Sequence, residues 1–467
     1  MPLPRTDRLL LLGLVVVNLV LKLCWLGVNE LAHDEPFTVF WSQRPWAELW
    51  AMFRTENNPP LYFLLIKAWS ALAPFEAAWL RVPSAVFSAL AVWPLFLLAR
   101  HFGGRGAALL AGLLFTCSNY HYGFAHEVRA YPLFTLLTTT GLWLLVRATE
   151  RPGQEMKGML HLSMLNVALV YTHFFGWLVV GLQGLLVFAI PALRPLRRGF
   201  LFGAGMTVIG FLPYGIIFLE RMSQSVGQGT WLAPPVPEEL YNMVWRWSNA
   251  PVLTVVFLAL IVAAVGKDRL RSAGLRFALT WAFAPLLGMF AVSFAVPMFL
   301  DRYLVYAAPG FALLVALSVA VLFPNERLRA GVIGALGLGL VATFTPWKDT
   351  GLHPSRVVQV EQEWCGDDCS VQVLPSWYWL THLAAKDINS LRRPTDQHLA
   401  YFTGTGRRMD AKSPSAPLDT LPVALVIDAG AHLVDPDRLW YKDLRAKYPH
   451  VDSVEADRKV WLYRFRR

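Results

Sequence analysis

The feature that most constrains this chain is a series of apolar stretches of about the length that crosses a bilayer as a helix. They lie at about residues 9 to 28, 82 to 99, 107 to 122, 131 to 147, 159 to 174, 176 to 191, 199 to 219, 251 to 266, 275 to 296, 303 to 323 and 329 to 345. Hydrophobic residues make up 55% of the 467 residues and charged residues only 16%, more apolar than a water-soluble core requires. We therefore expect an α-helical polytopic membrane protein with about eleven transmembrane helices.

Two apolar segments near the N-terminus, Leu9 to Val28 and Pro59 to Ala73, have alternatives to an ordinary transmembrane helix. The stretch from Leu9 to Val28 follows a charged start and has no small-residue cleavage site behind it, so a retained helix is expected instead of a cleaved signal peptide. The segment from Pro59 to Ala73 is short and carries Lys67. We expect it to form an interfacial or re-entrant helix in the first external loop.

Basic residues are distributed unequally between the loops. With Pro59 to Ala73 kept out of the membrane, roughly sixteen basic residues fall in one set of loops and about eight in the other, which indicates a cytoplasmic N-terminus. The loops at 29 to 81, 119 to 130 and 220 to 250 and the tail after Trp347 are then external, in a multi-pass protein of the cell (inner or plasma) membrane. The net charge of +10 predicts no nucleic-acid partner, because the basic residues form no stripe.

The tail differs in character from the rest of the chain. LPVALVIDAG predicts a buried strand, DPDRLWYKDLRAKYP a helix and VWLYRFRR a closing strand. We expect a transmembrane domain at 1–346 and a small extracytoplasmic α/β domain at 347–467. Cys365 and Cys369, in CGDDC, are either a local disulfide outside the cytoplasm or two free thiols.

The first external loop opens with the charged triplet His33-Asp34-Glu35. Adjacent carboxylates at a membrane surface suit general-base chemistry, because a low local dielectric raises the proton affinity of one of them. The alternative is a solvated helix start in which Asp34 is the N-cap.

Two further polar segments lie on the same predicted side. Glu56, Asn57 and Asn58 precede a double proline, and they are either held above the membrane face or form an ordinary polar turn. The next external turn carries His126, Glu127, Arg129 and Tyr131. Glu127 and Arg129 are either a structural pair or a carboxylate beside a phosphate ligand. The enzyme hypothesis requires the carboxylates at 34, 56 and 127 to converge in one water-accessible cavity.

The later external junctions add His173 and the run Asp301-Arg302-Tyr303. His173 either caps or packs a helix end or acts in the site. Arg302 either extends to the interface or binds an anionic headgroup. Glu56, Glu127 and His173 are candidate ligands of a divalent metal, but the sequence contains no HExxH spacing, so the metal is only weakly supported.

Several of these segments resemble one family. The pattern is an Asp-Glu pair after the first span, then NNPPLYFLLIKAW, LRVPSAVFSALAVWPLFLLARHFGGRGAALLAGLLF and SNYHYGFAHEVRAYPLFTLL. It is similar to the GT-C-type membrane glycosyltransferases of the protein O-mannosyltransferase and lipid A aminoarabinose transferase superfamily. The similarity covers most of residues 1 to 180 and is more diffuse through 345.

The resemblance implies an inverting transfer of sugar from a polyprenyl-phosphate donor to a glycolipid, polysaccharide or protein acceptor at the outer membrane face, among membrane lipids. It implies that Asp34 is the catalytic base and that Glu35 completes the acidic motif. The candidates for binding the donor phosphate are Lys67, Arg129, Tyr131, Arg302 and Tyr303. The expected lining of the site comprises His33, Glu56, Asn57, Asn58, His126, Glu127, His173 and Asp301. Asn57 and Asn58 stand where relatives often have His-Pro-Pro, which weakens a metal role.

Two other classes of protein fit parts of the pattern. A transporter or flippase of a lipid-linked sugar would use the same charges for binding alone, but transporters commonly place functional charges near the bilayer midplane and contain internal repeats. Neither feature is evident here. A membrane scaffold that presents its tail to partners is the third reading, in which the acidic residues would gather by accident.

Overall fold

A computed structural model describes residues 3–150, 153–228, 232–347, 349–365, 369–393, 423–433 and 435–467. The helices are α1 (Arg5–Leu23), α2 (Glu35–Ser42), α3 (Trp46–Thr55), α4 (Pro60–Ser70), α5 (Ala77–Leu90), α6 (Val92–Thr116), α7 (Asn119–Ala125), α8 (Tyr131–Ala148), α9 (Glu155–Thr172), α10 (Gly176–Ala189), α11 (Arg197–Gln228), α12 (Glu238–Ser248), α13 (Pro251–Asp268), α14 (Ala273–Val292), α15 (Ala308–Leu322), α16 (Glu326–Thr343), α17 (Pro354–Cys365), α18 (Trp379–Lys386), α19 (Asn389–Arg392) and α21 (Leu439–Lys447). Short 3₁₀ turns are η1 (Pro191–Leu196), η2 (Asp301–Leu304), η3 (Ser376–Tyr378) and η4 (Ala431–Leu433). The strands are β1 (Cys369–Leu374), β2 (Val423–Asp428), β3 (His450–Asp457) and β4 (Val460–Arg466).

The chain divides into two compact units. The helical unit comprises Met1–Trp25, Trp50–Leu65 and Arg81–Pro346, and the sheet unit comprises Leu26–Leu49, Ile66–Leu80 and Trp347–Arg467. The segment 26–80 is therefore shared, because its two outer parts group with the tail and its middle part, Trp50–Leu65, groups with the bundle helices. Each unit is described by itself.

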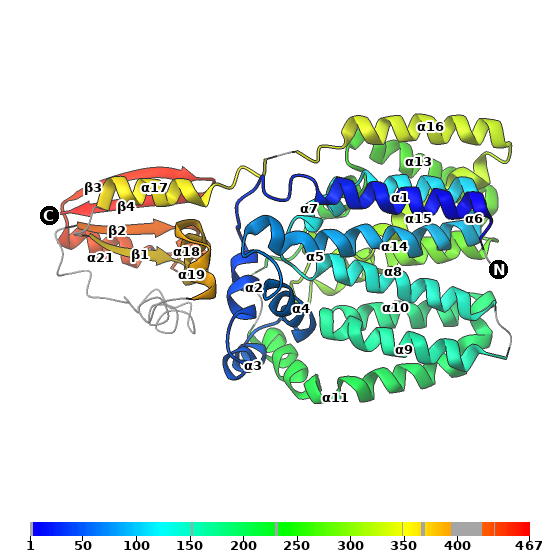
Figure 1. The fold of residues 1–467 in the computed structure, drawn as a ribbon, viewed down its shortest axis with the longest axis horizontal. Coiled ribbons are helices and arrows are strands. Elements are labelled where there is room, and N and C mark those ends of the chain that lie inside the picture. The colour runs from blue at the N-terminus through cyan, green and yellow to red at the C-terminus, as the bar shows by residue number, and fades with distance from the viewer. Residues whose placement is uncertain are drawn as a thin grey trace. The chain divides into compact units, whose positions relative to one another are not determined.

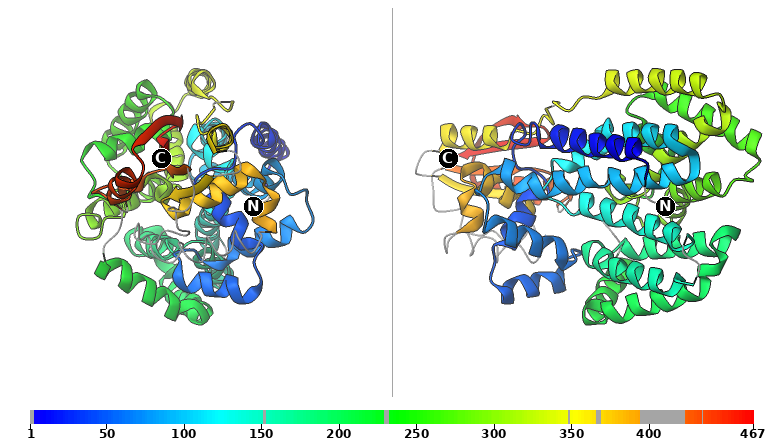
Figure 2. Two further views of the ribbon diagram at one scale, coloured as in Figure 1. Left: turned by 90° about the vertical axis from the view of Figure 1, so that its left-hand side faces the viewer. Right: turned by 45° about the vertical axis from the view of Figure 1, so that its right-hand side comes forward.

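The helical unit is a bundle centred on α15. Nearly every residue of α15 is buried, as expected for a helix that is hydrophobic all round, and it packs against α6, α13 and α14. A second group forms where α9 packs between α8 and α11. These helices run side by side along the unit (Figures 1 and 2). Helix α6 is interrupted at Gly104, whose φ of 79° is a conformation that glycine adopts readily and other residues rarely adopt.

Each apolar stretch predicted from the sequence overlaps helix, although the stretches at 9 to 28 and 275 to 296 run past the ends of α1 and α14 and the stretch at 107 to 122 crosses from α6 into α7. Four described helices are long and apolar enough to cross a bilayer by length and composition, at Ala77–Thr116, Pro191–Gln224, Pro251–Asp268 and Ala273–Val292, and two apolar helices, Gly176–Ala189 and Ala308–Leu322, are shorter. The expected number of eleven spans stays a prediction. The segment expected to lie at the interface forms α4, whose 11 residues extend about 17 Å, well short of a bilayer core of about 30 Å.

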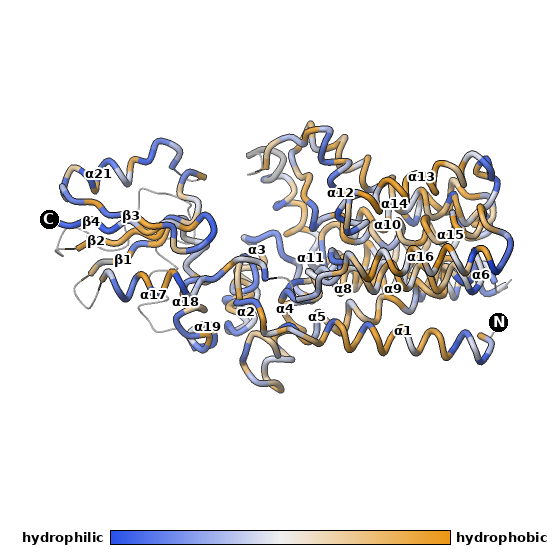
Figure 3. The backbone as a smooth tube through the Cα atoms, turned by 90° about the horizontal axis from the view of Figure 1, so that it is seen from above, coloured by the Kyte–Doolittle hydropathy of each residue, from blue (hydrophilic) through white to orange (hydrophobic). Residues whose placement is uncertain are grey.

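Apolar side chains also cover the outside of the helical unit. On α11, Leu201, Leu212 and Ile216 are 60%, 61% and 71% exposed, and on α13, Val255 and Val262 are 62% and 70% exposed. Figure 3 shows hydrophobic residues along much of the bundle helices. A surface of this kind is stable against lipid chains and unstable against water.

The sheet unit contains a four-stranded mixed sheet in the order β1-β2-β4-β3. Strand β1 is parallel to β2, and the pairs β2–β4 and β4–β3 are antiparallel. Alternating residues of β2 point to opposite faces: Ala424 and Val426 pack with Trp440 of α21, whereas Leu425 and Ile427 pack with Val357 of α17. The two helices therefore cover opposite faces of the sheet, and the expected α/β tail is confirmed.

The first external loop completes the sheet unit. Helix α2 packs against α18 and α19, and the Arg44 guanidinium just beyond α2 donates to the carbonyl groups of Leu391 and Arg392 at 3.4 and 3.1 Å. Helix α2 is thereby fixed to the tail, more than three hundred residues away in sequence.

Candidate active site

Asp34 occupies the N-cap position of α2. Its main-chain carbonyl accepts hydrogen bonds from the Thr38 amide at 3.2 Å and the Thr38 hydroxyl at 3.1 Å. Within the described loop, the Asp34 carboxylate makes no capping hydrogen bond to the helix. The start of α2 therefore does not by itself account for an acidic side chain at this position.

The residues on either side of Asp34 shape the turn. His33 has a φ of 53°, a left-handed conformation that costs free energy in a residue with a Cβ atom. Glu35 is 5% exposed, and its carboxylate accepts from the Ala32 amide at 3.4 Å. Glu35 thus closes the turn that presents Asp34.

Lys67 lies at the other end of α2. Its ammonium donates to the carbonyl groups of Arg44 at 2.7 Å and Ser42 at 3.3 Å, a favourable site for a cation because the carbonyl end of a helix is negative. Burial, together with the charge of Arg44, lowers the pKa of Lys67. Lys67 thus supports the end of α2, and its role as a phosphate ligand stays a prediction.

In the helical unit, His173 connects two arginine–tyrosine pairs. Its imidazole lies 5.9 Å from the rings of both Tyr131 and Tyr303 and stacks on Phe134 at 5.0 Å. Its Nδ1 accepts from the Phe175 amide at 3.1 Å. An imidazole held by rings and by a main-chain amide is fixed in orientation.

Arg129 and Arg302 flank this imidazole. The guanidinium carbons lie 5.7 Å from the ring centres of Tyr131 and Tyr303 respectively, and both positive charges act on His173. Two loops that are distant in sequence thus each bring an arginine–tyrosine pair to His173. Planar guanidinium groups are suited to binding a phosphate oxyanion.

The structure gives Asp301 and His126 defined supporting contacts. The Asp301 carboxylate pairs with Arg246 at 2.6 Å and accepts from the Arg302 amide at 2.7 Å. His126 Nε2 lies 3.1 Å from the Lys22 carbonyl, and the Glu127 carbonyl accepts from the Arg129 amide at 2.8 Å. The Asp301 contacts shape the turn that carries Arg302, and the His126 and Glu127 contacts shape the turn that carries Arg129. Sequence reasoning missed Arg246, whose only signal was its place as a basic residue within the predicted loop 220 to 250.

The polar segment before the double proline contacts α11. The Asn57 side-chain oxygen accepts from Arg221 at 3.1 Å, and the Asn58 carbonyl accepts from the Tyr214 hydroxyl at 3.5 Å. Glu56 follows α3, where its amide donates to Met52 at 2.9 Å. The sequence contained no signal for Arg221, since the pairing joins loops far apart in the chain.

The candidate metal ligands do not gather. Among the described residues, no group of three or more His, Cys, Asp and Glu side chains could hold a metal ion. His173 lies instead among aromatic rings and two arginine charges, which repel a cation. In the sheet unit, Cys365 and Cys369 form a disulfide.

Solved structures share this arrangement of helices and sheet. ArnT from Cupriavidus metallidurans, bound to undecaprenyl phosphate, matches with a TM-score of 0.62 and 16% identity over 97% of this chain and 97% of that chain. The chain has the GT-C fold. The GT-C chain is also similar to AglB, an oligosaccharyltransferase from Archaeoglobus fulgidus in complex with an inhibitory peptide and a dolichol-phosphate, with a TM-score of 0.54 and 11% identity over 91% of this chain and 69% of that chain.

Sequence comparison gives one result for this GT-C chain. The family described as dolichyl-phosphate-mannose-protein mannosyltransferase matches residues 57–216. This segment includes α4 and the turn with Glu127 and Arg129. No curated protein sequence matches.

Proposed function

We propose that this protein is a multi-pass membrane glycosyltransferase that moves a sugar from a polyprenyl-phosphate donor to a glycolipid, polysaccharide or protein acceptor at the outer face. The observation that carries the proposal is the pair Arg129 and Arg302, held by separate loops around His173. Helix α1 reaches the same end of the helical unit, where the Tyr122 hydroxyl donates to the Cys24 carbonyl at 3.1 Å. Asp34 follows nine residues after Trp25 in the sequence.

The chemistry requires little beyond a base and an anion site. Asp34 takes the proton of an acceptor hydroxyl or amine, and the acceptor lone pair attacks the anomeric carbon as its bond to the phosphate oxygen breaks. The electron pair leaves on the polyprenyl phosphate, whose charge Arg129 and Arg302 stabilise. Direct attack inverts the configuration at the sugar carbon. No step passes through a metal ion.

Glu35 and the two tyrosines support this chemistry. Glu35 completes the acidic motif and holds the turn through the Ala32 amide. Tyr131 and Tyr303 lie against the arginine side chains and help to orient the guanidinium planes toward the donor. Lys67 and Glu56 remain candidates for contacts with donor and acceptor.

The basic residues near the start of α1 support a membrane orientation in which the N-terminus is cytoplasmic. At the N-terminal end of α1, the fully buried Asp7 carboxylate pairs with Arg100 and Arg105, each at 2.6 Å. Further basic residues, among them Arg5 and Arg8, lie near that end in sequence, and an excess of lysine and arginine favours the cytoplasm. The N-terminus is then cytoplasmic, and residues 347–467 form an extracytoplasmic domain.

The two lipid-phosphate complexes support the donor class. The ArnT and AglB structures are complexes with undecaprenyl phosphate and dolichol-phosphate, and the matched family is described as dolichyl-phosphate-mannose-protein mannosyltransferase. A lipid phosphate places its leaving group at the membrane surface.

Transfer by purified protein tests the proposal. Detergent-solubilised protein, which has no second compartment, is expected to consume a polyprenyl-phosphate sugar in the presence of an acceptor extract, whereas Asp34→Asn is expected to be inactive. Asp437→Asn, at an exposed position of the sheet unit, is the matched control and should keep full turnover. Turnover by the Asp34→Asn protein would remove the base assignment, and absence of donor consumption by the wild type would favour transport.

A further inference from the structure

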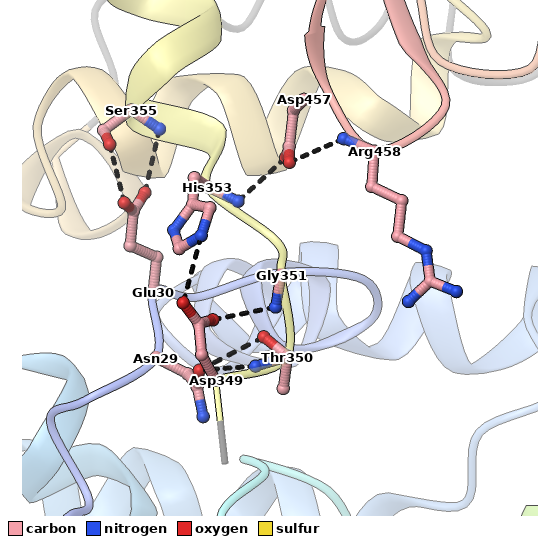
Figure 4. Close-up of polar contacts among 9 residues, drawn as sticks. All are labelled: Asn29, Glu30, Asp349, Thr350, Gly351, His353, Ser355, Asp457 and Arg458. Atoms are coloured by element: carbon pink, nitrogen blue, oxygen red, sulfur yellow. Dashed lines mark hydrogen bonds and ion pairs between the residues drawn. The ribbon is translucent and has the colours of Figure 1, made fainter. Parts of the chain in front are cut away.

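The loop that leads into Asp34 is hydrogen-bonded to the start of the tail. The Glu30 carboxylate accepts from the Ser355 amide at 2.8 Å and from the Ser355 hydroxyl at 2.6 Å. The neighbouring Asn29 side-chain oxygen accepts from the Thr350 amide at 3.1 Å and hydroxyl at 3.2 Å. Figure 4 shows these pairs together, and we call the four residues the latch.

The latch uses the charge at the beginning of α17. Ser355 lies in the first turn of that helix, where amide groups without partners in the helix point outward and favour an anion. Glu30 satisfies one of these amides with its carboxylate. The bond is charge-assisted and joins two segments 325 residues apart in the chain.

The latch is in turn fixed to the sheet. The His353 amide donates to the Asp457 carboxylate at 3.0 Å, and Asp457 is the last residue of β3. His353 Nε2 also lies 3.2 Å from the Asp349 carboxylate. The start of α17, which donates hydrogen bonds to Glu30, is therefore attached to the sheet (Figure 4).

Only Leu31, Ala32 and His33 separate the latch from Asp34. Leu31 and Ala32 are buried, and His33 holds its left-handed φ of 53°. A residue with a Cβ atom keeps such a conformation only where its surroundings enforce it. The latch on one side and the α2 turn on the other supply that constraint.

The far end of α2 is held by the same unit. Arg44 is 7% exposed and donates to α19 carbonyl groups, so α2 is attached to the tail at both ends. We propose that the tail positions the catalytic base, with Glu30 as the positioning residue that transmits the placement of α17 to Asp34. This inference rests on the proposed function, because it requires Asp34 to be the base.

Kinetics of latch variants test the proposal. Glu30→Gln is expected to lower kcat about tenfold while the donor KM stays within about twofold, because a misplaced base slows chemistry without weakening ground-state binding. Glu30→Asp keeps a carboxylate and is expected to recover part of the lost kcat. Ser355→Ala removes only the hydroxyl and should have a smaller effect. The double variant should be no slower than Glu30→Gln, since the two side chains act through one contact.

A matched variant separates positioning from general loss of stability. Asp452→Asn breaks the ion pairs with Arg464 and Arg466 at 2.8 and 2.9 Å in the same unit but does not touch the latch. It should keep the wild-type kcat and the wild-type hydrogen exchange of α2 amides, whereas Glu30→Gln should speed that exchange. Equal losses of kcat in both variants would overturn the proposal.

The outcomes distinguish the two proposals. If Asp34→Asn is inactive and Glu30→Gln keeps the wild-type kcat, Asp34 is the base and the latch does not position it. If Asp34→Asn keeps its activity, the proposed function fails whatever the latch variants do. A rise in donor KM with unchanged kcat in Glu30→Gln would also overturn the positioning role.

Discussion

Glu361 of α17 and His382 of α18 share a hydrogen bond of 2.5 Å inside the sheet unit. The His382 side chain has no exposed surface, and the second oxygen of Glu361 accepts from Lys386 at 2.6 Å. Because neutral imidazole can donate through Nε2 to a carboxylate, the pair needs no charge on the histidine. It joins α17, which carries Ser355, to α18, which packs on α2.

The pair makes the stability of the sheet unit sensitive to acid. Burial lowers the pKa of His382 below its usual 6.5 even though Glu361 opposes the shift. Burial raises the pKa of Glu361, but the hydrogen bonds and charges of His382 and Lys386 outweigh it, so its pKa is below the usual 4.5. Unfolding therefore takes up protons below pH about 6.5, and stability falls as the pH falls.

Proteolysis measures this acid sensitivity. The midpoint temperature for cleavage of the tail should fall steadily from pH 7 to pH 4.5. In His382→Gln, which keeps an amide donor but does not titrate, the fall between pH 6.5 and 5 should be weaker. Identical pH profiles for the two proteins would contradict the assignment.

Arg129→Gln and Arg302→Gln are each expected to raise the donor KM. Loss of one hydrogen-bonded charge from an anion site costs about 1.5–3 kcal/mol, or roughly ten- to a hundredfold in affinity. Steady-state kinetics with varied lipid donor measure the change. Arg327→Gln, on the exposed first turn of α16, is the control. A donor KM unchanged in both variants would exclude the two arginines from the phosphate site.

Lys67→Met should lower kcat more than it raises the donor KM. The ammonium already donates to Arg44 and Ser42, so its loss frees the end of α2, at a cost of about 1 kcal/mol in helix stability. Hydrogen exchange of the α2 amides should increase. A donor KM at least tenfold higher with normal kcat would instead place Lys67 at the phosphate.

Gly104→Ala should destabilise the helical unit by about 1–3 kcal/mol, because φ 79° and ψ −170° suit only glycine. The thermal midpoint in detergent measures the effect. Gly13→Ala is the control: a Cβ atom there meets nothing within 4 Å, and alanine favours the helix. Equal thermal midpoints for the two variants would show that the conformation at position 104 does not require glycine.

Local sequence patterns were sufficient to predict many of the helices and strands. Hydrophobic runs of spanning length predicted the positions of the bundle helices, the short run with Lys67 predicted α4, and the tail patterns predicted β2, α21 and β4. Each depends on the periodicity of neighbouring residues. Strand β1 was missed because polar residues interrupt its CSVQVL run, and β3 because HVDSVEAD is half polar, as suits its place at the sheet edge.

Partners distant in sequence were not predictable in this way. The residues alone left Asp34 as either a base or an N-cap and Arg129 as either a pair member or an anion ligand. The structure places Asp34 at the N-cap position of α2 without a capping hydrogen bond from its side chain, so its role as the base stays a prediction. The approach of the Arg129–Tyr131 and Arg302–Tyr303 pairs to His173 depends on how the loops fold together. The expected convergence of the carboxylates at 34, 56 and 127, and the division at residue 347, stay predictions.

The sequence by itself determined that the chain is membrane-embedded, roughly where its apolar helices lie, and which residue types occupy the loops between them, because each depends on the solvent preference and periodicity of adjacent side chains. Only the tertiary structure decided that the Glu30 carboxylate accepts a hydrogen bond from Ser355 and that α2 packs in the same unit as the tail. A hydrogen bond between segments 325 residues apart leaves no periodic trace in either segment, since it depends on the path of all the chain between them.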